Sequence, residues 1–125
     1  MAIDKVTYWK ELADYDIDTA EVMFTGGRWL YVGFMCHQTI KAYWSAIKPD
    51  EIPFIHNLLK LAQSCGLVSK MSQEQLKFLA ELMPMNIEAR YPSYKDKLFK
   101  KLTPEYCRIL IDKTKELKLW IENLL

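Results

Sequence analysis

Apolar residues recur every three or four positions along most of this 125-residue chain, which is the spacing of one face of an α-helix. The first such stripe predicts a helix of about twenty residues that ends at the paired glycines Gly26 and Gly27. The second predicts a helix over about residues 28–48, which Pro49 ends. The two stripes consist of Val6, Trp9, Ala13, Ile17, Ala20 and Phe24, and of Trp29, Val32, Cys36, Ile40, Tyr43 and Ile47.

Capping signals place two further helices in the middle of the chain. A short helix over about residues 54–65 has Gly66 in the position of a left-handed cap. Ser72 followed three residues later by Gln75 predicts a capping box at the start of a fourth helix, which Pro84 should kink. The apolar stripe of this fourth helix consists of Leu76, Leu79, Met83 and Ile87.

The last helix is predicted to begin at Thr103-Pro104-Glu105, an N-cap followed by a proline and an acid in the first turn. Residues 91–102 before it are predicted to form a loop, because the pair Tyr91-Pro92 disfavours helix. The stripe of the last helix consists of Tyr106, Ile109, Lys113, Leu117, Trp120 and Leu124, of which Ile109, Leu117 and Trp120 should pack into the protein. No segment alternates with the period of a strand. The expected fold is therefore all-α, an up-and-down antiparallel four-helix bundle with an additional short helix, in a single domain over residues 1–125.

Charge is unevenly distributed, although the formal net charge is only +1. Residues 1–25 hold six acids and two lysines, a net of −4, whereas residues 90–108 hold six bases and two acids, a net of +4. Such runs are typical of a solvated helix face and a polar loop, and they also suit an acidic helix that pairs with a basic loop.

The three cysteines form no CxxC pattern, so neither a disulfide framework nor a zinc site is expected. The two histidines lie in no metal-binding motif, and no cofactor is expected. The first residues are too acidic for a signal peptide, and no apolar run reaches the roughly 18 residues of a membrane span. We therefore expect a cytoplasmic protein with no membrane association.

Two groups of residues are candidates for ligand binding. His37, Lys41 and Trp44 form a second stripe on the second helix, either a boundary row partly covered by another helix or a second subunit, or a polar patch that meets a ligand or partner. Gln38, next to His37, joins His37 and Lys41 as a candidate ligand residue. The second group combines cations with aromatic rings, a mixture that can hold a phosphate and stack a base. It consists of Arg90, Tyr91, Tyr94, Lys95 and Lys97, with Lys100 and Lys101 behind them. Ordinary solvated loop lysines are the alternative explanation.

Four segments in order resemble the HEPN family of small helical-bundle domains, and together they cover nearly the whole chain. These are YWKELADYDIDTAEVMF, CHQTIKAYWSAI, IPFIHNLLKL and NIEARYPSY, the last of which resembles an Arg-Tyr-Pro motif at the end of the family's fourth helix. Gln38 matches the family's second helix, whereas His37, Lys41 and Ala42 depart from its Gln, Glu and Lys pattern.

Many HEPN proteins resemble metal-independent ribonucleases whose site is an Arg, four to six further residues and a His. That motif is missing here, since eight residues separate Arg28 from His37 and no His follows Arg90 or Arg108. The absence of this ribonuclease motif favours the interpretation that the protein is not an enzyme.

The resemblance then implies the other branch of the family, a noncatalytic nucleotide-binding or accessory domain. Its implied partners are a nucleotide or RNA, a small nucleotidyltransferase subunit in a toxin-antitoxin-like pair, and a second copy of the chain. The dimer face is expected in the row Arg28, Tyr31, His37, Lys41 and Trp44. The alternatives are a divergent ribonuclease toxin that uses Arg90, His37 or His56, and a plain helical interaction module.

Overall fold

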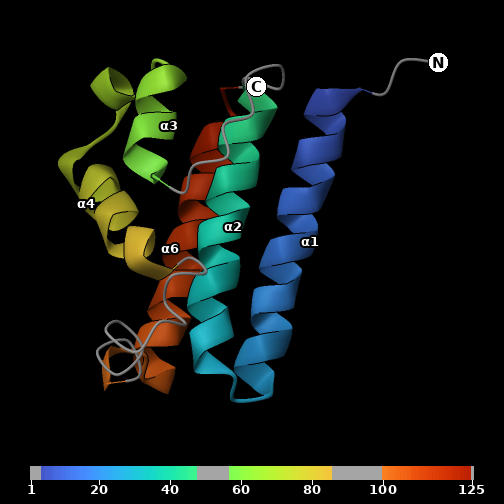
Figure 1. Ribbon diagram of the computed structural model, residues 1–125, viewed down its shortest axis with the longest axis vertical. Coiled ribbons are helices and arrows are strands. Elements are labelled where there is room, and N and C mark those ends of the chain that lie inside the picture. The colour runs from blue at the N-terminus through green and yellow to red at the C-terminus, as the bar shows by residue number, and fades with distance from the viewer. Residues whose placement is uncertain (1–3, 48–56, 86–99, 125) are drawn as a thin grey trace.

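The computed structural model describes residues 4–47, 57–85 and 100–124, and every regular element in these ranges is helical. The elements are α1 (Lys5–Thr25), α2 (Trp29–Ile47), α3 (Leu58–Ser64), a 3-10 turn η1 (Val68–Lys70), α4 (Gln73–Leu82), a second 3-10 turn η2 (Met83–Met85) and α6 (Pro104–Glu122). The long helices α1, α2 and α6 run side by side, and α3 and α4 lie on one side of α2 (Figure 1). This arrangement confirms the expected all-α antiparallel bundle with an additional short helix.

Local sequence signals account for most helix ends. Gly27 ends α1 and Gly66 follows α3, and both adopt a positive φ of 71°, which glycine reaches without a steric penalty. Ser72 and Gln75 form the expected capping box at the start of α4, with hydrogen bonds of 2.9 and 3.1 Å. At the start of α6, the backbone N–H of Tyr106 donates to the Thr103 side chain, as predicted.

The α-helical part of α4 is shorter than predicted. It ends at Leu82, and Met83–Met85 continue as a 3-10 turn instead of a kinked α-helix. Pro84 explains the change, because it has no backbone N–H to donate to the carbonyl four residues earlier. Ile87, expected on the same helix, lies outside the described residues. The loop predicted over 91–102 is likewise wrong at Lys100 and Lys101, which are helical.

Helix α2 lies at the centre of the bundle and is buried on most of its circumference. The sequence predicted one apolar face, but Ala42, Ala46 and even the polar Thr39 are also buried. The Thr39 hydroxyl donates to the Met35 carbonyl one turn earlier at 2.8 Å, so its burial leaves no hydrogen bond unmade. A helix that packs against neighbours on several sides needs small residues, or polar residues whose hydrogen bonds are made within the helix itself.

Helix α6 turns a different face inward from the one predicted. Leu117 is buried as expected, but Ile109 is 47% exposed and Trp120 is only half-buried. The buried stripe consists of Cys107, Leu110, Ile111, Thr114, Leu117 and Ile121. Thr114 is compatible with the core because its hydroxyl donates to the Leu110 carbonyl at 2.7 Å. Lys113 is exposed, and if the predicted face were turned inward its charge would have to be buried.

Charged side chains join α1 to α6. The Glu21 carboxylate accepts hydrogen bonds from both terminal nitrogens of Arg108, at 2.6 and 2.9 Å, and from Lys115 at 2.7 Å. About two helical turns before Glu21 on α1, Asp14 forms a salt bridge with Lys118 of α6 at 2.7 Å. Part of the acidic charge of the first helix is therefore balanced by α6.

Candidate functional site

His37 lies inside the bundle. Its side chain is fully buried, and its Nδ1 lies 3.1 Å from the carbonyl oxygen of Leu82, the last residue of α4. Because a carbonyl only accepts, Nδ1 carries the proton in this contact. The imidazole thus connects α2 to the end of α4 inside the core. Binding of a ligand by His37 stays a prediction.

Gln38 and Lys41 lie beside His37 on α2 and are both half-buried. Burial of the Lys41 ammonium lowers its pKa, because a charged group loses hydration when it is partly covered. A cation in this state gains more from an anionic partner or ligand than a fully exposed lysine does.

Helix α1 adds an acid, Asp16, that no motif in the sequence indicates. Partial burial raises the pKa of the Asp16 carboxyl to about 6. Asp14 and Glu21, on the same helix, point toward α6, where their salt bridges lie. Asp16 follows Ala13 by three residues and precedes Ala20 by four, which places it on the other flank of the buried stripe, away from α6.

Asp16 lies at about the same level of the bundle as Gln38 and Lys41. Helices α1 and α2 are antiparallel neighbours joined at Gly26 and Gly27, and the three residues are similarly far from that turn along the chain. At about 1.5 Å per residue, their levels differ by no more than about one helical turn. We call Asp16, Gln38 and Lys41 the α1–α2 polar strip. Partial burial shifts the pKa values of Asp16 and Lys41, which makes both residues candidates for a ligand site.

The basic and aromatic group Arg90, Tyr91, Tyr94, Lys95 and Lys97 lies outside the described residues. Its role in ligand binding therefore stays a prediction. Lys100 and Lys101, behind this group, are exposed at the protein surface, and the Lys101 ammonium lies 5.3 Å from the ring centre of Tyr106.

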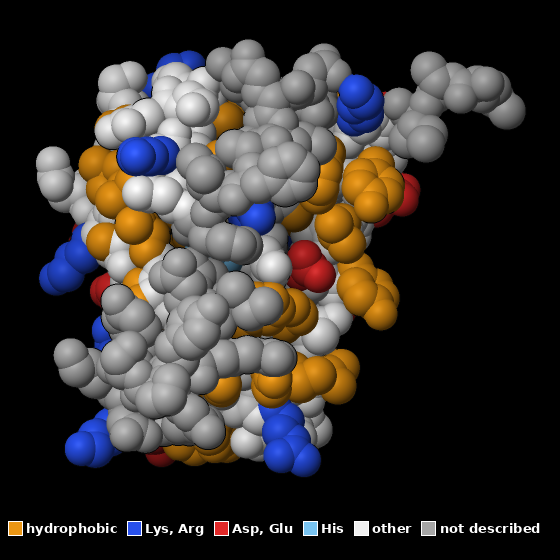
Figure 2. Space-filling model, in the orientation of Figure 1, with side chains coloured by type: hydrophobic (Ala, Val, Ile, Leu, Met, Phe, Trp, Pro, Cys, Tyr) orange, Lys and Arg blue, Asp and Glu red, His pale blue; other side chains and the backbone are white. Residues whose placement is uncertain are grey.

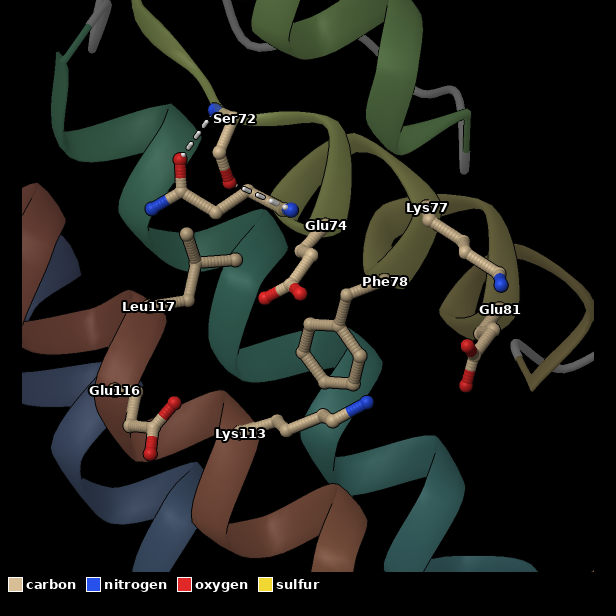
Figure 3. Close-up of a pocket in the computed structure, with 9 residues that line it drawn as sticks. Ser72, Glu74, Lys77, Phe78, Glu81, Lys113, Glu116 and Leu117 are labelled. Carbon is tan, nitrogen blue, oxygen red and sulfur yellow. Dashed lines mark hydrogen bonds between the residues drawn. The ribbon is translucent and has the colours of Figure 1, made fainter.

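A groove of about 550 Å³ separates α4 from α6 on another side of the molecule (Figure 3). Phe78 and Leu117 line it with apolar surface, and the Lys113 ammonium lies 5.9 Å from the Phe78 ring centre. The charged residues of the lining also include three carboxylates and one further lysine, namely Glu74, Glu81, Glu116 and Lys77, and the neutral Ser72 and Gln75 complete it. With more acids than bases, the groove disfavours a phosphate group. The sequence carries no local signal for this groove, because its two walls are far apart along the chain.

The buried thiols are poor nucleophiles. Burial raises the pKa of Cys36 to about 12 and that of Cys107 to about 11, so both remain protonated at neutral pH. Cys36 is the buried small residue that the sequence indicated. Among the residues that the structure describes, no group of His, Cys, Asp and Glu side chains could hold a metal ion.

The row predicted for a dimer interface needs correction. His37 and Trp44 are 0% and 1% exposed within the single chain, so a second subunit cannot cover them. The Cys65 thiol donates to the Trp44 carbonyl at 3.5 Å, which shows that α3 approaches α2 at this level. Arg28 and Tyr31, in contrast, are exposed at the end of α2 near the turn.

The family model of the HEPN domain matches residues 6–124 of the chain. The chain belongs to the HEPN domain family. Comparisons with curated proteins and with solved structures give no match. In this HEPN domain, Gln38 and Lys41 of the α1–α2 polar strip lie in the second-helix segment of the family resemblance, and Asp16 lies in the first-helix segment. None of the described helices is long and apolar enough to span a membrane.

Proposed function

We propose that this HEPN domain is a noncatalytic accessory domain that binds a nucleotide or RNA and serves a small nucleotidyltransferase partner. The observation that carries the noncatalytic part is the position of His37. A ribonuclease needs a base that reaches the 2′-hydroxyl of its substrate, and this imidazole is fully buried against the Leu82 carbonyl. The Arg-x4-6-His motif is also missing from the sequence.

Ligand binding is supported by charge and residue type. Arg90 offers a planar guanidinium that suits a phosphate, and Tyr91 or Tyr94 offers a stacking surface to a base. Lys95 and Lys97 add long-range attraction that salt screens. Among the described residues, the α1–α2 polar strip could add contacts to such a site, because its Lys41 is partly dehydrated.

Thermal unfolding in the presence of nucleotides and short RNAs tests the proposal. A ligand at a hundred times its dissociation constant should stabilise the parent protein by about 2.7 kcal/mol. Arg90→Ala should abolish this stabilisation at any salt concentration, whereas Arg28→Ala, which removes an exposed arginine near the α1–α2 turn, should not change it. Replacing Lys95, Lys97, Lys100 and Lys101 by Gln should weaken binding mainly at low ionic strength.

Two results would separate the alternatives. Degradation of RNA that is lost in the His37→Ala and His56→Ala pair would establish a divergent ribonuclease. Unchanged stability with every nucleotide and RNA up to millimolar concentration, or parent-like binding by Arg90→Ala, would remove the nucleotide site and leave a helical interaction module.

A further inference from the structure

Helix α1 carries a second stripe on its outer face, turned away from the bundle. The stripe follows spacings of four and three residues in alternation, which is the spacing of a coiled-coil seam. It consists of Tyr8, Leu12, Tyr15, Thr19 and Val22. Tyr8, Tyr15 and Val22 are 53%, 70% and 64% exposed. Figure 2 shows hydrophobic side chains along the outer edge of the molecule, where Figure 1 places α1.

The most exposed residues of this outer stripe lie outside the buried core of the domain, although the Tyr8 ring contacts that of Trp9 at 5.2 Å between ring centres. The bundle uses Ala13, Ile17 and Ala20, which lie on the opposite side of the same helix and are fully or almost fully buried. Large exposed apolar side chains arranged in register along a helix mark an interaction surface more often than scattered ones do.

Acids flank the outer stripe on both sides. Glu11 and Asp18 are exposed on one flank, and neither forms an ion pair with a described residue. Asp16 lies on the other flank. These three differ from Asp14 and Glu21, whose charges are balanced by α6.

A second copy of α1 fits this face poorly. In an antiparallel pair, the seam spacing brings Glu11 of one helix opposite Asp18 of the other, and in a parallel pair it brings Glu11 opposite Asp16. Both directions thus place like charges together, which costs stability. A helix with bases beside its seam would meet acids instead.

The size of the stripe also suits a single helix. At about 200 Å² for each tyrosine side chain, the exposed parts of Tyr8 and Tyr15 amount to roughly 250 Å². Leu12 and Val22 extend this area, but it stays well below the roughly 800 Å² that each partner contributes to a standard interface between globular proteins.

We propose that the outer face of α1 binds a basic amphipathic helix of a partner protein. The inference rests on the accessory part of the proposed function; it shares Asp16 with the α1–α2 polar strip, whereas the outer stripe, Glu11 and Asp18 have no part in the proposed nucleotide site. The partner helix would lay its apolar residues between Tyr8 and Val22, while its Lys or Arg side chains would pair with Glu11, Asp16 and Asp18. The nucleotide experiments above have separate readouts, so either proposal can fail alone.

The test uses a labelled synthetic helix of about 20 residues with leucines at the seam positions and lysines beside them. Fluorescence anisotropy with the full chain should show saturable binding of this peptide, and much weaker binding of the same peptide with glutamates in place of the lysines. Tyr15→Ser and Val22→Ser should each weaken binding at least about tenfold. Ile109→Ser, which alters an exposed apolar residue of α6, should leave it unchanged.

Charge reversal makes the test specific. The double variant Glu11→Lys and Asp18→Lys should no longer bind the lysine peptide and should bind the glutamate peptide instead. Its circular-dichroism spectrum should match that of the parent, because both positions are exposed. Equal binding of both peptides to the parent, or no effect of Tyr15→Ser, would overturn the proposal. So would a dimer of the chain alone that Tyr15→Ser dissociates in sedimentation, since the occupant would then be a second copy.

Discussion

The Glu21 carboxylate allows a quantitative test of how α1 and α6 are held together. The Arg108 guanidinium, and after it the Lys115 ammonium, hold the pKa of this carboxyl at about 2, well below its ordinary value of 4.5. Because the pKa is lower in the folded protein, the charged carboxylate stabilises the fold. That stability is fully present above about pH 4.5 and is lost as the pH falls toward 2.

The expected magnitude follows from the pKa and the exposure. At about 1.4 kcal/mol for each pKa unit, the lowering corresponds to an upper limit of about 3 kcal/mol. Solvent screens the interaction, since the Glu21 side chain is 34% exposed, and Arg108 keeps a second partner in Asp112 at 3.1 Å. We therefore expect Glu21→Gln to lower the free energy of unfolding by about 1–2 kcal/mol at pH 7.

Urea unfolding of the parent and of Glu21→Gln between pH 7 and pH 3 measures this effect. The difference between the two proteins should be constant down to about pH 5 and should shrink below it, because protonation then removes the same charge from the parent. Glu11→Gln is the matched control, since Glu11 is exposed on the same helix and pairs with no described base. A difference that is absent at pH 7, or that does not change with pH, would refute the reasoning.

Two further predictions concern stability. Burial raises the pKa of the Asp16 carboxyl to about 6 and penalises its charged form. Asp16→Asn should therefore stabilise the protein by about 1 kcal/mol at pH 7, and by progressively less as the pH falls through about 6 toward 4. An unfolding free energy unchanged at pH 7 would contradict this. Leu110→Ala should cost about 2–5 kcal/mol, since Leu110 is fully buried, whereas Trp120→Ala should cost only about 1–2 kcal/mol, less than the 3–5 kcal/mol of a buried aromatic. Urea unfolding that ranks the two in the opposite order would show that the inward face of α6 is misassigned.

Most helix boundaries and the fold class could be predicted from the sequence because their signals are local. The capping box of Ser72 and Gln75, the Thr103 cap and the glycines at 27 and 66 act on backbone groups within a few residues. Four ordered segments were likewise enough to indicate the HEPN family, whose model matches nearly the whole chain.

Tertiary packing decided which side of each helix is inside and which residues meet. The spacing around Leu117 suits two neighbouring faces of α6, and the fold selects the one where Thr114 satisfies its own hydroxyl over the one that contains Lys113. The sequence makes His37 a candidate ligand residue, yet in the packed bundle its side chain is fully buried, with Nδ1 3.1 Å from the Leu82 carbonyl oxygen of α4. The shifted pKa of Asp16 and the groove between α4 and α6 depend on surfaces from helices that are distant along the chain. Burial and proximity are properties of the packed bundle, and no local spacing encodes them.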